Sequence, residues 1–483
     1  MRLPLAPRLC LTLAALLFCA AEAPSPAAPP PLTIADGAAI AAVLKSAPAQ
    51  GLAAPDETAD AAALADPDPA VRADAEARLV KAAIAYAADE HGDALDPRAV
   101  DRNFDLRAPY DAAADFARAR AAGQVAAWIT GLVRKDGAYL ALVAARAEYA
   151  ALVQQGGWPP VAAGKPLRPG ASDPRAPDLR RRLAIEGYVD ATPVDPKTPE
   201  LFDLGLSAAL ADFQAHHALP SDGVLTPETT AALNVNASDR LAAIDLNLLR
   251  ARWMPPAPPA ERIEVDTAAP DATLFVDGQP ALAMRAIVGQ PTKRTPSFAA
   301  EVVGVEFNPP WIVPRDIAAR ELYPHERRSP GYFARNDFYV SNGQLIQRAG
   351  PKSALGYIKF DVVDPFTVYL HDTPSRSWFA SDKRWRSHGC IRLQMPRELA
   401  TLLLGPQGWT REAVDAAIAA HATRTVPLKA HTPVFVVYRT AVATPDGKVA
   451  FRPDVYGWDQ ELAKALVEGA PAIPHGEVTK AAP

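Results

Sequence analysis

The chain has 483 residues, of which 49% are apolar and 22% are charged, a composition typical of folded globular proteins. This length exceeds what one hydrophobic core ordinarily holds, so we expect several domains. The formal net charge of -5 excludes a general nucleic-acid binder, because such proteins carry an excess of basic residues. Many of the 49 prolines lie in connectors, which we interpret as stiff spacers between folded units.

The N-terminus has the pattern of a secretory signal peptide, which we assign to residues 1–23. Arg2 and Arg8 precede an apolar run from Leu9 to Ala21, and the small residue Ala23 follows. The run is too short for a standard membrane-spanning helix. A proline directly after Ala23 disfavours cleavage there, so an uncleaved signal would leave an N-terminal membrane anchor.

Residues 27–155 are rich in alanine at helical spacing, and we interpret them as a helical scaffold. Two sets of residues recur at the spacing of one helix face. These are Val71, Ala75, Leu79 and Ala82 in the first predicted helix, and Ala122, Val125, Ile129 and Leu132 in the second.

Residues 172–236 show the pattern of three short helices. Thr226 is a predicted N-cap, and Pro227 follows at the first helical position. The pairs Phe213-Gln214 and Asp222-Gly223, in their order and spacing, resemble those of three-helix peptidoglycan-binding modules. Each of these residues also fits plain core or turn chemistry, so the resemblance implies a cell-wall address without locating a ligand site.

Residues 237–260 are predicted to form one helix, from Asp239 to Trp253, and a proline-rich linker. If this helix packs back on the scaffold, the three-helix module is an insertion between two scaffold segments.

After the linker the apolar period changes from that of a helix to two, which predicts a mainly β domain over residues 261–440. Asp277-Gly278 is the turn of a predicted hairpin. Residues 308–356 form a long excursion between strands, and we interpret it as a lid over a functional site. Residues 441–483 form a C-terminal extension with a turn at Asp446-Gly447 and a helix.

Chemistry concentrates in the run Ser387-His388-Gly389-Cys390-Ile391-Arg392-Leu393. The other two cysteines lie in the predicted signal, so the exported chain would hold one thiol and no internal disulfide. Gly389 allows a turn whose own amide and that of Cys390 could face an oxyanion. A predicted helix beginning near Met395 could lower the thiol pKa through its dipole.

Two histidines are candidates for the base that takes the proton of Cys390. His388 is two residues away in the same turn, and His371 ends a predicted strand 19 residues earlier. Directly opposed residues on paired strands come closer than residues i and i+2 of one strand, so His371 is better placed if the two strands pair. His388 would then support the turn.

The competing interpretations are a metal site and an inert buried thiol. His371, His388 and Cys390 are acceptable zinc ligands, with Asp372 nearby, but no Cys-x-x-Cys or His-x-x-x-His spacing supports such a site. We therefore predict no metal and no cofactor.

Three further runs give the β domain a family resemblance. They are Tyr369-Leu370-His371-Asp372-Thr373, Asn308-Pro309-Pro310-Trp311-Ile312-Val313-Pro314 and Ala354-Leu355-Gly356-Tyr357-Ile358-Lys359-Phe360. Together with the cysteine run, they resemble the L,D-transpeptidase catalytic domain of the large periplasmic type. The implied fold is multidomain α+β: a mainly-β L,D-transpeptidase catalytic domain with an α-helical scaffold and a small three-helix peptidoglycan-binding module.

The resemblance implies a transpeptidase of the periplasm and cell wall, acting on peptidoglycan stem peptides and inhibited by carbapenems. Cys390 is implied as nucleophile, His371 as general base, His388 as a supporting residue, and Gly389 with Cys390 as the oxyanion hole. Candidate substrate-binding residues are Arg392, Tyr369, Trp311 and Ser387, although a structural ion pair would also explain Arg392.

Two alternatives stay open. An L,D-carboxypeptidase or a protein-to-wall attachment enzyme would share the acyl-enzyme, whereas an inactive wall-binding scaffold would not form it. Ser353 and Arg348 depart from the residues usual in this family, asparagine and glutamine, and both flank the base of the predicted lid.

Overall fold

The computed structural model describes residues 29–93, 95–107, 109–192 and 195–468. The predicted signal peptide and anchor lie outside these ranges. Within them, no helix is long and apolar enough to cross a membrane.

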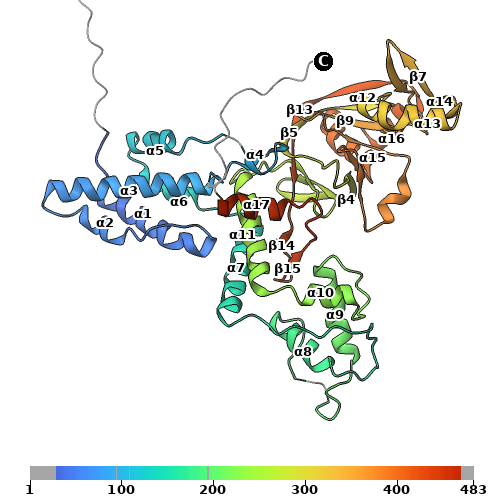
Figure 1. Cartoon of the computed structure of the whole chain (residues 1–483). Helices are drawn as coiled ribbons and strands as arrows, with labels where there is room; N and C mark the ends of the chain where they lie inside the picture. The colour runs from blue at the N-terminus through green and yellow to red at the C-terminus, as the bar shows by residue number, and fades with distance from the viewer. Residues whose placement is uncertain (1–28, 94, 108, 193–194, 469–483) are drawn as a thin grey trace, which may run out of the picture.

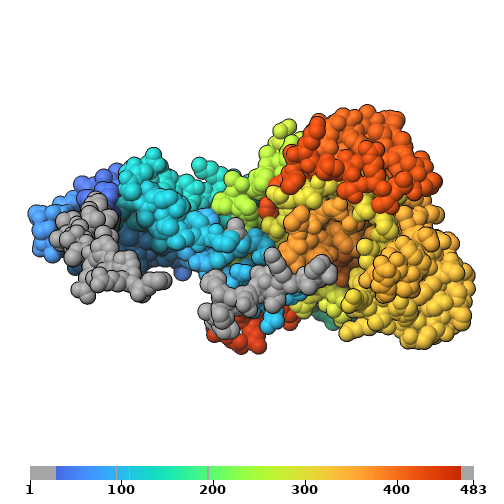
Figure 2. Space-filling model, turned by 90° about the horizontal axis from the view of Figure 1, so that it is seen from above, coloured from blue at the N-terminus to red at the C-terminus, as the bar shows by residue number. Residues whose placement is uncertain are grey.

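The molecule is elongated, with a helical scaffold at one end and a β domain at the other (Figure 1). A three-helix module projects to one side from the middle, and the view from above again separates scaffold and β domain (Figure 2). The predicted multidomain α+β class is therefore confirmed.

The scaffold consists of seven helices and one short 3-10 turn: α1 Ile34–Ser46, η1 Ala47–Gln50, α2 Thr58–Ala63, α3 Pro69–Glu90, α4 Pro97–Val100, α5 Ala112–Ala121, α6 Val125–Leu132 and α7 Gly137–Gln154. Ala75, Leu79 and Ala82 are buried on α3 as predicted, whereas Val71 is exposed. The second helix was predicted to be too long at its N-terminus: Ala122 caps the end of α5, and α6 begins only at Val125.

The three-helix module comprises α8 Ala176–Ile185, α9 Leu204–His216 and α10 Pro227–Leu233 around one apolar core. The predicted cap is confirmed: the Thr226 hydroxyl accepts from the Thr229 N–H, and Pro227 opens α10. Gln214 is buried, where its amide donates to Val224 O at 2.9 Å and accepts from Gly223 N at 2.8 Å. Gln214 and Gly223, two of the residues on which the resemblance rests, are thus hydrogen-bonded within the module itself.

The module is an insertion, as predicted. Helix α11 Ala237–Trp253 packs back against α7, so scaffold residues flank the module on both sides. At this junction Glu186 accepts from the Tyr149 hydroxyl at 2.5 Å, and its carbonyl accepts from Lys448 Nζ at 2.5 Å. Arg182, which is fully buried, pairs with Glu186 and lies 3.7 Å from the Trp158 ring centroid.

The β domain is a sheet that closes into a ring. Its strands are β2 Arg262–Asp266, β3 Asp271–Val276, β4 Gln279–Gly289, β5 Ser297–Phe307, β9 Ile358–Val363, β10 Leu370–His371, β12 Ile391–Leu393 and β13 Arg424–Val437. The order β5-β13-β2-β3-β4-β12-β10-β9 returns to β5, because β9 also pairs with β5. Helices α15 Pro396–Leu404 and α16 Arg411–Ala419 pack on its apolar core.

Three additional elements attach to this ring. Strand β11 Trp385–Ser387 pairs with β4, and β1 Phe104–Asp105 of the scaffold pairs in parallel with β5. The C-terminal extension forms β14 Ala441–Ala443, β15 Val449–Phe451 and α17 Trp458–Glu468. The predicted hairpin turn is confirmed, since Asp277 and Gly278 both have positive φ, at 51° and 75°.

The long excursion is a small folded unit with its own apolar cluster. It contains β6 Trp311–Ile312, α12 Arg315–Ile317, the π-turn η2 Ala318–Leu322, α13 Tyr323–Arg328, α14 Tyr332–Arg335, β7 Phe338–Ser341 and β8 Gln344–Gln347. At its base the Ser353 hydroxyl accepts from the Leu355 N–H, and Gln347 accepts from the Ala354 N–H at 2.9 Å.

Gly223→Ala should destabilise the module far more than Gly278→Ala destabilises the hairpin. Gly223 has φ +65°, and an added Cβ would lie 2.6 Å from Ser207 O, whereas Gly278, at φ +75°, has open space. We expect the free energy of unfolding to fall by about 2–4 kcal/mol for Gly223→Ala and by about 1 kcal/mol for Gly278→Ala. Both substitutions add left-handed strain, and only Gly223→Ala adds a backbone clash. Calorimetric unfolding of the full chain measures both, and equal losses would contradict the expectation.

Candidate active site

Cys390 lies in a tight turn between β11 and β12, here called the cysteine turn (residues 387–390). Gly389 adopts φ +123°, a conformation that L side chains rarely adopt. The Ser387 hydroxyl donates to Cys390 O at 2.6 Å and accepts from the Gly389 N–H at 3.1 Å. Ser387 is buried, and both of these hydrogen bonds lie inside the turn, so its hydroxyl stabilises the turn.

The strand bearing His371 does pair with the strand that follows Cys390. Strands β10 and β12 are parallel, with Leu370 opposite Ile391 and His371 opposite Arg392. When this register is extended by one residue toward the N-terminus, Tyr369 lies opposite Cys390, and His371 lies diagonally across from Cys390. Because alternate residues share a face, His371, Arg392 and Cys390 lie on one side of the pair, while Leu370 and Ile391 enter the core.

His371 is held as a neutral imidazole. Burial lowers the pKa of His371 to about 3, and the nearby Arg392 charge acts in the same direction. Its Nδ1 lies 2.5 Å from Asp372 O, and since a carbonyl can only accept, Nδ1 carries the proton. His371 Nε2 is then the nitrogen with a free lone pair, as a general base requires.

The Cys390 thiol is neutral in the resting site. Burial raises its pKa, against the smaller lowering effects of Tyr369 and Arg392. Burial and the neighbouring Cys390 also raise the pKa of the Tyr369 hydroxyl. The helix predicted to begin near Met395 is confirmed, since α15 begins at Pro396, but the predicted lowering of the thiol pKa is wrong: the pKa is raised, and β12 lies between Cys390 and this helix.

Arg392 is a half-buried cation without a carboxylate partner among the described residues. Its Nε has no hydrogen-bond partner there, and its guanidinium lies 5.1 Å from the Trp378 ring centroid. Burial lowers its pKa, and Cys390 is the group that raises it. A structural ion pair, the alternative left open by the sequence, is not among its contacts.

The two amides expected to form an oxyanion hole are not equivalent. The Gly389 N–H donates to the Ser387 hydroxyl inside the turn, so this amide already has a partner. Cys390 itself lies outside the strands and helices, and its N–H donates to no backbone carbonyl among the described residues. It is therefore the candidate donor.

His388 connects the cysteine turn to the excursion, and Trp311 connects the excursion to Tyr369. His388 Nε2 lies 2.7 Å from Glu321 Oε1 in η2, and Lys293 Nζ lies 3.0 Å from the same oxygen. His388 therefore contacts the excursion and not the thiol. Trp311, at the start of the excursion, is close enough to the Tyr369 hydroxyl to lower its pKa.

The residues considered for a metal site have other partners. Asp372 accepts from the Tyr357 N–H at 3.0 Å and pairs with Arg376 at 3.0 Å. No cluster of three or more His, Cys, Asp or Glu residues suited to a metal ion occurs in the described part of the chain.

Sequence reasoning missed three residues that surround the turn: Glu321 on His388, Thr295 on the Gly389 carbonyl, and Tyr456 on Gly289. Thr295 is 94 residues from Gly389, and Tyr456 is 167 residues from Gly289. No local pattern marks such contacts, because they join segments that are far apart in the sequence and meet only in the folded chain.

Comparison with known families matches three parts of the chain. Residues 260–436 match the "L,D-transpeptidase catalytic domain", residues 33–145 match a "Scaffold domain", and residues 172–233 match a "Putative peptidoglycan binding domain". These matches confirm the family resemblance and the order of its parts.

Individual relatives are more distant. A Haemophilus influenzae protein named "Putative L,D-transpeptidase" is 31% identical over 213 residues, covering 40% of this chain. The chain spans 43% of the length of that relative. An L,D-transpeptidase structure from Xylanimonas cellulosilytica is 16% identical and has a TM-score of 0.19. The match covers 57% of this chain and 98% of the Xylanimonas chain. The Enterococcus faecium catalytic domain acylated by ertapenem is 17% identical and has a TM-score of 0.21. The match covers 37% of this chain and 96% of the Enterococcus chain.

Alkylation of Cys390 by iodoacetamide should accelerate continuously from pH 5 to pH 9. The thiolate is the reactive form, and a raised thiol pKa makes its fraction grow about tenfold per pH unit over this range. His371, with its pKa of about 3, stays neutral throughout and adds no inflection near pH 6.5. Mass spectrometry of the Cys390 peptide follows the rate. A pH-independent plateau between pH 5 and 7 would instead indicate a preformed thiolate–imidazolium pair.

Proposed function

We propose that this chain, whose residues 260–436 match the L,D-transpeptidase catalytic domain, cross-links peptidoglycan stem peptides through a thioester at Cys390. The observation that carries the proposal is the β10–β12 pair, which gathers on one face a thiol, a neutral imidazole and a half-buried guanidinium that has no carboxylate partner among the described residues. A thiol, a base and a stabiliser of negative charge are the parts that acyl transfer needs.

In the first half-reaction, Cys390 Sγ attacks the carbonyl carbon of the third residue of a tetrapeptide stem. The thiol proton passes to His371 Nε2 as the C–S bond forms, because both groups are neutral at rest. The oxyanion accepts a hydrogen bond from the Cys390 N–H. When the intermediate collapses, the C–N bond to D-alanine breaks, and the departing amine takes the proton from His371.

In the second half-reaction, the side-chain amine of the third residue of another stem attacks the thioester. His371 accepts the proton of that amine, the C–S bond breaks, and the proton returns to the Cys390 sulfur. The product is an amide between two third residues. Arg392, whose charge lowers the thiol pKa, favours the thiolate as leaving group.

We assign the surrounding residues by their contacts. Tyr369 and Trp311 form the substrate-facing wall at the sulfur, and Arg392 is also available for a stem carboxylate. Ser387 acts by stabilising the turn, and its predicted contact with substrate is not part of this proposal. The excursion acts as the lid, held to the cysteine turn through Glu321 and His388.

The remaining parts supply the location. A peptidoglycan-binding domain next to a transpeptidase domain implies association with the cell wall. We propose that the enzyme acts in the periplasm, with residues 1–23 as the export signal or, if uncleaved, as an anchor. The proposed domain limits are 27–155, 172–236, 237–260, 261–440 and 441–483.

In a disaccharide-tetrapeptide assay, replacing the nucleophile should abolish both products, and replacing the base should slow their formation. Cys390→Ser should give no detectable D-alanine or cross-linked dimer, and His371→Gln should lower the rate of D-alanine release by about 10²–10⁴-fold. His431→Gln is the matched control, because this exposed histidine pairs with Glu301 on another part of the sheet.

The product pattern separates the alternatives. D-alanine release without dimers identifies a carboxypeptidase or an enzyme that uses a different acceptor amine. Folded wild-type protein that gives neither product would contradict the proposal and favour a wall-binding scaffold.

A carbapenem should acylate Cys390. Opening of the lactam by the sulfur adds the whole mass of the drug, since no group leaves when the ring C–N bond breaks. Intact-mass measurement should show one adduct per chain in the wild type and none in Cys390→Ser. A wild-type chain that folds and remains unmodified would count against an acyl-enzyme at this thiol.

A further inference from the structure

The loop of residues 290–295, between β4 and β5, contacts the cysteine turn directly; we call it the support loop. The Gln290 N–H donates to Ser387 O at 3.0 Å. The Thr295 hydroxyl donates to Gly389 O at 2.7 Å and accepts from the Gly289 N–H at 2.8 Å. Thr295 is fully buried, so water does not compete for these bonds.

The bond from Thr295 has a geometric consequence at Cys390. In a trans peptide, the carbonyl and the following N–H point in opposite directions. With the Gly389 carbonyl turned toward Thr295, the Cys390 N–H points away from the support loop. Gly389 at φ +123° has wide conformational freedom, so local preference alone does not hold this peptide plane.

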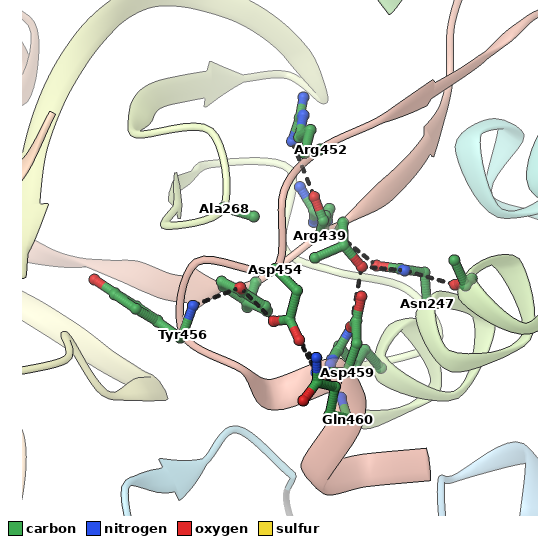
Figure 3. A network of polar contacts seen from close by, with 12 residues as sticks. Asn247, Ala268, Arg439, Arg452, Asp454, Tyr456, Asp459 and Gln460 are labelled. Carbon is green, nitrogen blue, oxygen red and sulfur yellow. Dashed lines mark hydrogen bonds and ion pairs between the residues drawn. The ribbon is translucent and has the colours of Figure 1, made fainter. Parts of the chain in front are cut away.

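Tyr456 of the C-terminal extension holds the support loop and its neighbour Gly289. The Tyr456 hydroxyl donates to Gly289 O at 2.7 Å and receives the Thr295 N–H at 3.4 Å. The Tyr456 N–H donates to the Tyr438 hydroxyl at 3.0 Å, which in turn donates to Asp454 at 2.7 Å. Figure 3 shows Asp454 and Tyr456 within this network of the C-terminal extension.

Arg294 of the same loop joins the scaffold to helix α17. Its guanidinium lies 3.2 Å from Asp101 of the scaffold and 3.1 Å from Glu461 of α17. The Trp458 indole N–H donates to the same Asp101 carboxylate at 2.9 Å. The scaffold and the C-terminal extension therefore meet at the loop that contacts the cysteine turn.

We infer that Thr295 is a positioning residue that aims the Cys390 N–H at the oxyanion, and that Tyr456 holds Thr295 in place for this task. The inference rests on the proposed function, because it assumes that an oxyanion forms beside Cys390. It gives the C-terminal extension a part in catalysis without any contact between that extension and the substrate.

Two reactions of the same sulfur test the inference. Acylation by a carbapenem passes through an oxyanion, whereas alkylation by iodoacetamide does not. In the full chain, Thr295→Val should lower the acylation rate by about 10–100-fold, given that loss of one oxyanion donor costs about 10²–10³-fold. The alkylation rate should stay within about twofold, and Thr295→Ser should restore acylation. Tyr456→Phe, which keeps the ring, should lower acylation in the same direction by a smaller factor.

Ser297→Ala is the control for general loosening of this region. The Ser297 hydroxyl is equally buried and donates to Val436 O at 2.8 Å, but it does not contact the cysteine turn. It should leave both rates unchanged.

The outcomes are distinct. Normal acylation in a folded Thr295→Val chain would overturn the inference and leave the proposed function intact. Equal losses of acylation and alkylation would also overturn it, because the thiol itself would then be disturbed. A wild-type chain that is alkylated but never acylated would refute the proposed function and the inference together.

Discussion

The parallel pairing of two short strands, β10 and β12, creates the site. It brings His371 beside Arg392 and, one residue earlier, Tyr369 beside Cys390. Strands of two and three residues do not hold such a pairing alone. They are fixed because β9 and β4 pair with their outer edges and the sheet closes through β9 and β5. The arrangement of the candidate catalytic groups therefore depends on the integrity of the whole ring.

The parts outside the ring are attached to it by buried polar contacts. Arg134 donates to the carbonyls of Glu90, Arg252 and Met254, which ties scaffold helix α3 to the end of α11. Asn247 of α11 bonds Thr440, and Arg250 pairs with Asp459 of α17, in the network of Figure 3. Buried polar groups lose water and must be paired, so such contacts favour one arrangement of the parts. This explains how scaffold and extension can reach the support loop in a defined geometry.

Much of the fold was predictable because it follows from local signals. The Asp277-Gly278 hairpin, the Thr226 cap and the helix ending at Trp253 each depend on a few neighbouring residues. Errors arose where nearby sequence competes with distant contacts. The strand predicted to end at His371 contains only Leu370–His371, and β12 separates Cys390 from the helix expected to act on its thiol.

The sequence by itself determined the candidate groups of the site: a cysteine beside a glycine, a histidine at the end of a predicted strand, and motifs that resemble those of L,D-transpeptidases. Residue type and short spacing carry that information. Only the tertiary structure decided which histidine is buried and neutral, which amide of the turn is free, and that Thr295 and Tyr456 support it. The physical reason is that burial and hydrogen-bond pairing depend on contacts between distant segments, such as Thr295 and Gly389, which are 94 positions apart.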